Sequence, residues 1–335
     1  MSLLGRTIDV GSTYRKPLAE LEDDLFLNTG DRRAKQTKFW ALLVLASLIA
    51  AGGVIGNSTP AVIGAMIVAP LGTPIYGVAL AAVIGSHKGM RGALLFLVGG
   101  IMLNIALGAL CGLVFVERMP LTVNPQVTGR TAPTVLDLAV AIFTGFAGSF
   151  ALTRKDVSDI LAGVAIAISL VPVLAVVGIT LGAGQFSMAL GAFLLFLANA
   201  AAILIAGTVV FGAAKYYQEA RNAAGEEGAR AVRNRGRAFI VILVLVLLIP
   251  LGYSSWRTVQ NERWQTSIQS DAENWLSGSG WRLNYVERRG DTYVVNVVGD
   301  GTSPPVARLK SAVRADVPAS VPVLLVREPG AFTSL

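Results

Sequence analysis

Long apolar segments separated by short polar ones fill the chain up to about residue 256, and a mixed polar sequence follows. A run of roughly 17 to 25 predominantly apolar residues is long enough to cross the hydrocarbon core of a bilayer as a helix. The membrane domain is therefore expected to be all-α. Seven segments predict transmembrane helices: Phe39–Ile55, Pro60–Ile84, Gly92–Val116, Val135–Leu152, Val157–Leu181, Met188–Phe211 and Ala238–Trp256.

Polar sequence lies at both ends of this region. Residues 1–38 are expected to form an arm with a short helix over Pro17–Leu27, whose leucines share one face. This helix either packs on the membrane domain, which we prefer, or binds a partner. Residues 257–335 predict a small soluble α+β domain of order α-β-β-α-β. Its expected elements are 257–277, 281–287, 291–298, 304–315 and 321–327.

The composition supports this division. Hydrophobic residues make up 53% of the chain and charged residues only 15%, whereas soluble domains carry about 25% charged residues. One Cys and one His exclude a disulfide framework and leave little for zinc or Ser–His chemistry. We therefore expect no enzyme, no cofactor and no metal site. The net charge of +7 does not indicate a nucleic-acid partner, because the excess lies in loops beside predicted spans.

Lys and Arg are distributed unevenly between the loops. If there are seven spans, the arm and residues 85–91, 153–156 and 212–237 share one side, and together they hold 17 Lys and Arg. The opposite loops, of which 117–134 is the longest, hold only two. Positively charged loops stay on the cytoplasmic side of a membrane. The N-terminus is therefore expected in the cytoplasm and the C-terminal domain on the other side of the membrane.

Residues 39–116 and 135–211 look like two copies of one three-span unit. Each has a first span, a short turn, a second span of 25 residues and a long third span. An odd number of spans forces the copies into opposite orientations, as in inverted-repeat transporters. The identities between the copies are few. They include Gly64/Gly163 and Leu71/Leu170 at an offset of 99 residues, and Asn104/Asn199 and Gly112/Gly207 at an offset of 95.

The second span of the first copy is expected to break near its middle. Pro60 suits the first turn of a helix. Pro70 and Pro74 each lack a backbone donor and clash with the carbonyl group one turn earlier, and Thr73 lies between them. The residues that can cap the start of this span are Asn57, Ser58 and Thr59.

The fifth span repeats the pattern. Pro172 is the breaker and frees the carbonyl of Ile168, Ser169 lies three residues before it, and the cap candidates are Asp156, Ser158 or Asp159. Carbonyl groups freed in lipid cost several kcal/mol each unless they face protein, water or an ion. Paired breaks in matching positions indicate a substrate site. A Pro kink satisfied by a neighbouring Ser or Thr is the alternative.

Polar side chains inside the spans are further candidates. Asn104 and Asn199 lie in the middle of the third and sixth spans, where each amide either forms an interhelical hydrogen bond or lines a pathway. Asp156 and Asp159 share a helix face and are either caps or the only candidates for proton coupling. Cys111 belongs to a face of small residues that favours helix packing and would also suit oligomerisation.

Four stretches resemble a known family: 57–74 with its Ala-Pro-Leu break, 130–138, 163–172 and 192–199. Together they are similar to the bacterial integral-membrane family catalogued as domain of unknown function 389, over about residues 35–215. The resemblance implies a polytopic inner-membrane protein and supplies neither catalytic residues nor a substrate. Where that family commonly has a second Pro after the fifth-span Pro, this chain has Val173, which implies a gentler second break.

These patterns predict a membrane transporter or channel for a small solute or ion, with its site between the broken second and fifth spans. Helix N-termini favour anions and freed carbonyls favour cations, so the sign of the solute stays open. The alternative is a non-transporting sensor or scaffold that acts through the C-terminal domain and a homo-oligomer. The bilayer is the other expected partner. The expected site residues are Asn57, Ser58, Thr59, Pro70, Thr73, Pro74, Asn104, Asp156, Asp159, Ser169, Pro172 and Asn199.

Overall fold

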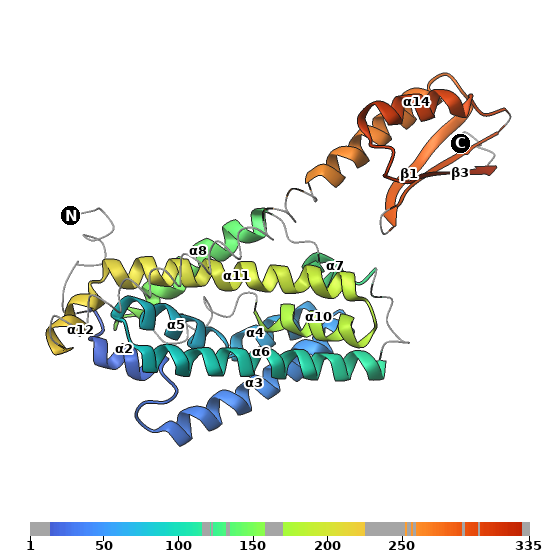
Figure 1. Cartoon of the computed structure of the whole chain (residues 1–335). Helices are drawn as coiled ribbons and strands as arrows, with labels where there is room; N and C mark the ends of the chain where they lie inside the picture. The colour runs from blue at the N-terminus through green and yellow to red at the C-terminus, as the bar shows by residue number, and fades with distance from the viewer. Residues whose placement is uncertain are drawn as a thin grey trace. The chain divides into compact units, whose positions relative to one another are not determined.

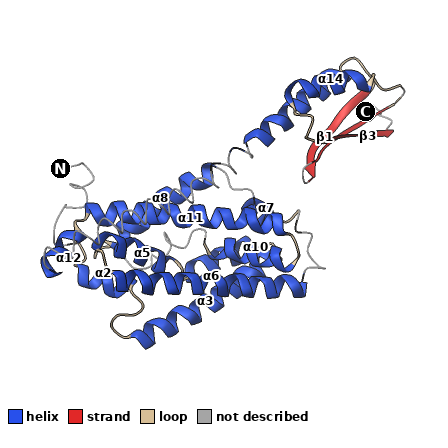
Figure 2. Ribbon diagram, in the orientation of Figure 1, coloured by secondary structure: helices blue, strands red, loops and turns tan. Residues whose placement is uncertain are grey.

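The computed structural model describes residues 14–115, 121, 123–131, 135–157, 170–224, 252, 256, 259–289, 292–300 and 302–329. The chain divides into two compact units, Met1–Tyr253 and Ser254–Leu335. The first is helical and the second contains a small sheet, as Figure 2 shows. The helices of the first unit are α2 (Leu18–Leu25), α3 (Arg32–Ile55), α4 (Thr59–Val68), α5 (Gly72–Ile84), α6 (His87–Phe115), α7 (Pro125–Thr131), α8 (Val135–Leu152), α10 (Val171–Gly182), α11 (Phe186–Ala213) and α12 (Tyr216–Ala224).

Within the described residues, α3, α6 and α11 are long and apolar enough to cross a membrane. Two bent pairs, α4 with α5 and α7 with α8, raise the number to five if each pair is one span. Large apolar side chains such as Leu95, Phe143 and Leu190 are exposed on the outer faces. These features fit a multi-pass membrane protein. Seven spans are not confirmed, because residues 158–169 and most of 238–256 lie outside the described residues.

Helices α5 and α10 lie end to end between α6 and α11 and pack against both (Figure 1). Leu71, just before α5, rests on Gly100 of α6. At the start of α10, the carbonyl of Val171 accepts a hydrogen bond from Asn104 of the same helix α6. The N-termini of α5 and α10 therefore meet beside the middle of α6. Two inverted copies would give this arrangement, and the N-cap residues Leu71 and Leu170 are a matched pair.

Four glycines bring α6 and α10 into close contact, and we call them the α6–α10 seam. An added Cβ would lie 2.7 Å and 2.4 Å from carbonyl oxygens of α10 at Gly108 and Gly112. It would lie 2.3 Å from carbonyl oxygens of α6 at both Gly178 and Gly182. Small residues allow such backbone contact in membrane helices. The face that the sequence offered for oligomerisation is thus occupied within the chain.

The N-terminal arm covers one end of the helical unit, which confirms its expected packing. Phe26, which follows α2, lies against Gly89 at the start of α6. The backbone N–H of Lys16 donates to the carbonyl of Thr153 over 2.9 Å, and the Tyr216 hydroxyl donates to the carbonyl of Lys16 over 2.9 Å. The arm, the 85–91 and 153–156 turns and the start of the basic segment therefore gather at the same end.

Residues 117–134 differ from the polar loop that the sequence predicted, because they contain helix α7. The side chain of Asn124 donates to the carbonyl of Val54 over 2.9 Å, and the Gln126 amide donates to the Thr59 hydroxyl over 2.8 Å. These bonds attach α7 to the turn between α3 and α4, while its other side packs on α11. A helix of seven residues is too short to show a clear helical period in the sequence, and it is unstable alone. The sequence therefore did not predict it.

The second unit has the predicted order α-β-β-α-β. Residues 259–276 are helical, followed by β1 (Trp281–Arg289), β2 (Thr292–Gly299), α14 (Val306–Asp316) and β3 (Val323–Pro329). The sheet order is β1-β2-β3, with β1 and β2 antiparallel and β2 and β3 parallel. The central strand β2 buries Tyr293, Val295 and Val297 against Ile268 and Ala272 of the first helix.

Candidate functional site

The break in the second span occurs at Pro70, as predicted. Helix α4 ends at Val68, and the following Ala69 is extended. The residue before a proline is disfavoured in the helical conformation, and Ala69 precedes Pro70. Pro70 therefore explains why α4 ends here. Helix α5 starts at Gly72 and is bent by 43° from α4. Pro74 does not make a second break, since it lies in the first turn of α5, where a helix needs no N–H.

Pro172 also lies in a first turn, that of α10. In this turn the N–H of Leu174 donates a hydrogen bond to the carbonyl of Leu170 over 3.1 Å. The amide of Asn104 donates to Val171 over 3.3 Å, while its Oδ1 is buried with no partner in the described part of the chain. The residue whose carbonyl Pro172 was expected to free, Ile168, lies outside the described residues.

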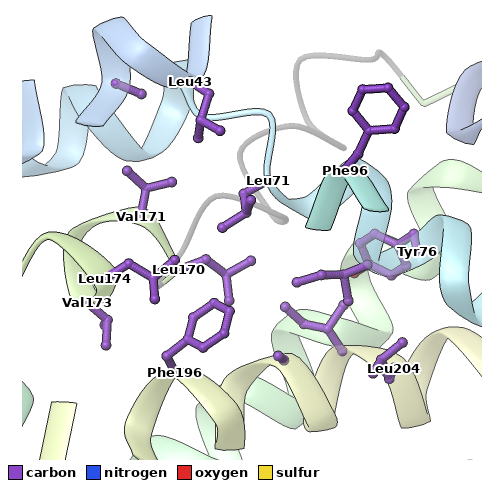
Figure 3. Packing of buried hydrophobic residues seen from close by; sticks show 14 of the residues in the cluster. Leu43, Leu71, Tyr76, Phe96, Leu170, Val171, Val173, Leu174, Phe196 and Leu204 are labelled. Atoms are coloured by element: carbon purple, nitrogen blue, oxygen red, sulfur yellow. The ribbon is translucent and has the colours of Figure 1, made fainter. Parts of the chain in front are cut away.

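Apolar side chains fill the space where the two N-termini meet. Leu71 and Leu170 are 1% and 3% exposed, and Phe196 of α11 is 1% exposed. Figure 3 shows Leu71, Leu170 and Phe196 in one cluster with Leu174. The junction between α5 and α10 is therefore apolar. A polar site has to lie beside it.

A cavity of about 320 Å³ lies next to this junction, between α4, α7, α8, α11 and the start of α10. Its lining extends over residues 136–144 of α8 and 195–203 of α11, and each range corresponds to about 12 Å along the helix axis. On α11 it reaches the middle of the helix. The lining residues are Met66, Gly129, Arg130, Leu136, Asp137, Val140, Ala141, Thr144, Leu170, Val173, Leu195, Asn199 and Ile203.

Arg130 is the positive charge of the cavity, and a hydrogen bond network fixes its position. Its Nη1 donates to the carbonyl and the side-chain oxygen of Gln126, over 2.8 Å and 2.9 Å. Gln126 in turn donates to Thr59. Among the residues that the structure describes, Arg130 forms no ion pair, and no hydrogen bond from its Nε or Nη2 is present. As a whole residue, Arg130 is half-buried.

The expected site residues lie in separate parts of the helical unit. Of the described ones, only Asn199 lines the cavity, where its side chain is 3% exposed. Thr59 reaches it indirectly through Gln126. Asp156 is exposed and paired with Arg154 over 2.6 Å at the arm end, and this hydrogen-bonded pair lowers the pKa of Asp156.

The remaining expected residues shape the backbone or lie outside the described ranges. Asn57 forms a turn with a positive φ of 48°, and Ser58 caps α4 by accepting from Ala61 over 3.4 Å. Thr73 donates its N–H to Pro70 over 3.1 Å in the first turn of α5. Asp159 and Ser169 fall outside the described residues.

Sequence reasoning gave little weight to three residues that line the cavity: Arg130, Asp137 and Thr144. Arg130 counted only as one of the two positive charges on the sparse side, and Asp137 was not among the expected site residues. A signal was present, because both lie in the 130–138 stretch that carries the family resemblance. In the described part of the chain, no group of three or more His, Cys, Asp or Glu side chains is placed to hold a metal ion.

Residues 66–205 match a family model described as a domain of unknown function (DUF389). The uncharacterized protein MJ0678 of Methanocaldococcus jannaschii is 29% identical over 199 residues, which cover 59% of this chain and 61% of the relative. The chain thus aligns with about three fifths of that relative. The relative is archaeal, so the expected bacterial character of the family is not confirmed. No solved structure matches. Every lining residue of the cavity lies inside the matched range.

Proposed function

We propose that this chain, similar over residues 66–205 to a family of unknown function, is a membrane transporter or channel for a small solute or ion. The cavity beside Arg130 and Asn199 is its binding site. The supporting observation is a cavity of about 320 Å³ with charged and amide side chains inside an otherwise apolar helical unit. Such side chains are costly within a membrane, and they mark solute pathways by default.

The geometry of the breaks supports the same proposal. Helices α5 and α10 begin near the middle of α6 and run to opposite ends, as the half-helices of inverted-repeat transporters do. The cavity touches Leu170 and Val173 at the start of α10, and Met66 near the end of α4. A solute in the cavity would therefore contact an element from each copy, which is what alternating access between two copies requires.

The orientation belongs to this proposal as well. The basic segments gather at the arm end, and the cavity residue Arg130 lies on α7, which is attached to the α3–α4 turn. With the basic end in the cytoplasm of a cell, α7 faces the other side. In a bacterium the membrane would be the inner membrane, and the second unit would lie outside the cytoplasm.

A flux measurement tests the proposal. Full-length protein is reconstituted into liposomes, and the uptake of a panel of labelled ions and small metabolites is compared with that of empty liposomes. We expect uptake of at least one solute, reduced about tenfold or more by Asn199→Leu, which keeps the branched shape of the side chain and removes the amide. The matched control is Leu190→Ala on the same helix, where the side chain is 60% exposed. Wild-type uptake equal to that of empty liposomes across the panel would refute transport.

The second unit supports a second candidate function, a sensor or scaffold. It has its own apolar core, formed by residues of both helices and the sheet. In this alternative the second unit binds a ligand or further copies of the chain, and the helical unit anchors it. The same experiment separates the two proposals, because a scaffold carries no solute and its activity does not depend on Asn199.

A further inference from the structure

Arg130 forms no ion pair in the described part of the chain, although the carboxylate of Asp137 lines the same cavity. The residue lines the cavity, and the ion pairs found among the described residues of the helical unit involve other side chains, all near the arm end. A guanidinium in a weakly polar environment is unfavourable unless an anion or several acceptors compensate it. From this geometry we infer that the cavity binds one oxyanion, a carboxylate or phosphate group, through Arg130. The inference rests on the proposed function of the cavity.

The hydrogen bonds of Arg130 leave one edge of the guanidinium available. Nη1 is held by Gln126 on the preceding turn of α7, which fixes the plane of the group. The opposite edge carries Nε and Nη2, a pair of parallel donors that matches the two oxygens of a carboxylate or phosphate. A lysine in this place would supply a charge without this fork. The pattern is that of an oriented anion receptor.

Other groups around the cavity suit the same ligand. The first turn of α10, at Leu170 and Val173, contributes the positive end of a helix. Asn199 and Thr144 add neutral polar groups that hydrogen bond to an oxyanion or to a neighbouring hydroxyl. Asp137 lines the cavity too, and its carboxylate repels a second anionic group. The volume of about 320 Å³ is at the small end for ligand sites. A small solute with a single oxyanion therefore fits best.

Binding to the full-length protein tests this inference without any flux. The protein is placed in nanodiscs of phosphatidylcholine, and calorimetry at constant ionic strength measures binding of acetate, inorganic phosphate and acetamide, the neutral isostere of acetate. We expect acetate or phosphate to bind and acetamide not to bind. Arg130→Gln should weaken binding about 10- to 100-fold, the effect of losing charge-assisted hydrogen bonds. Arg130→Lys should weaken it less. Arg91→Gln, an exposed cation at the arm end, should leave it unchanged.

An anionic lipid headgroup presents the same chemistry, so a second set of nanodiscs contains phosphatidylglycerol. If the headgroup fills the site, this lipid weakens binding of the probes to the wild type. It also raises the melting temperature of the wild type and leaves that of Arg130→Gln unchanged. Either source supports an oxyanion site. Equal binding by wild type and by folded Arg130→Gln, or no response to acetate, phosphate or phosphatidylglycerol, would overturn it. Flux of a cation that ignores Arg130→Gln would overturn this inference and leave transport standing. Binding that depends on Arg130, without any flux, would support the oxyanion site and refute transport.

Discussion

The α6–α10 seam gives a sharp test of the packing, through Gly178→Ala. A Cβ on Gly178 would lie 2.3 Å from the carbonyl oxygen of Ile105, 2.7 Å from the backbone nitrogen of Ala109 and 2.8 Å from the Cα of Gly108. All three are backbone atoms of one helix, so no side-chain rotation relieves the contact. Helix α10 would have to move away from α6 by about 1 Å to restore ordinary van der Waals distances.

The magnitude follows from two opposing effects. Overpacking of a close interface costs about 1 to 3 kcal/mol, and separating the helices also weakens the contacts at the other three glycines of the seam. Replacing glycine by alanine inside a helix returns up to about 1 kcal/mol. We therefore expect Gly178→Ala to destabilise the helical unit by about 2 kcal/mol. The matched control is Gly52→Ala in α3, where an added Cβ meets nothing within 4 Å, and we expect a gain of about 0.5 to 1 kcal/mol.

Reversible unfolding in mixed micelles measures both variants. The purified protein is titrated with a denaturing detergent, helicity is followed by circular dichroism, and the midpoints are compared at one protein concentration. The two substitutions should shift the midpoint in opposite directions. Equal or greater stability of Gly178→Ala relative to Gly52→Ala would show that α6 and α10 do not touch through this seam.

Three further predictions use the same protein. Asn104→Leu should retain solute flux and change stability by less than about 1 kcal/mol, because the substitution removes one long hydrogen bond and also one buried oxygen without a partner; detergent unfolding and liposome flux check it. Tyr216→Phe should destabilise the arm by about 1 kcal/mol through loss of the bond to Lys16, and limited trypsin digestion should cleave the arm faster. Burial and the charge of Asp316 raise the pKa of Asp271, so the second unit should be less stable once this carboxyl ionises; Asp271→Asn should slow hydrogen exchange in β2 near pH 7, and this gain should shrink as the pH falls through the raised pKa.

The sequence could predict those parts of the fold that follow from the surrounding bilayer or from the covalent structure of a single residue. Apolar segments such as Val135–Leu152 match the observed helix because the bilayer requires an apolar helix of that length. The break at Pro70 was predictable, since it follows from the covalent structure of proline. The role of Pro74 was not, because it depends on where α5 begins, and Leu71 and Gly100 set that start by packing together.

Helix α7 and the cavity show what the sequence could not provide. The α7 segment is polar and short, and its position depends on hydrogen bonds from Asn124 and Gln126 to residues about 70 positions earlier. The cavity forms where α7 and α8 face α11, so its charged residues, Arg130 and Asp137, become neighbours of Asn199 only in three dimensions. Charge counts along the chain indicate topology and say nothing about such contacts.

The two matched asparagines illustrate how a repeated sequence can give one site in place of two. Asn104 lies beside the α6–α10 seam and is 0% exposed, bonded to Val171. Asn199 occupies the matching position on α11 and lines the cavity. The copies therefore agree in where the amide lies along the helix and differ in what surrounds it.

The two expected copies also differ at the positions that match the glycines of the α6–α10 seam. At the offsets that relate the copies, Ile203 stands where Gly108 stands, and Ala79 stands where Gly178 stands. Neither position carries a glycine that would allow the backbone contact of the seam, and Ile203 lines the cavity beside α8. The glycine-rich α6–α10 interface is closed, and the cavity lies on the side of α11 that faces α7 and α8. The proposed binding site thus lies where the sequences of the two expected copies differ, and none of Pro70, Pro74 and Pro172 lines it.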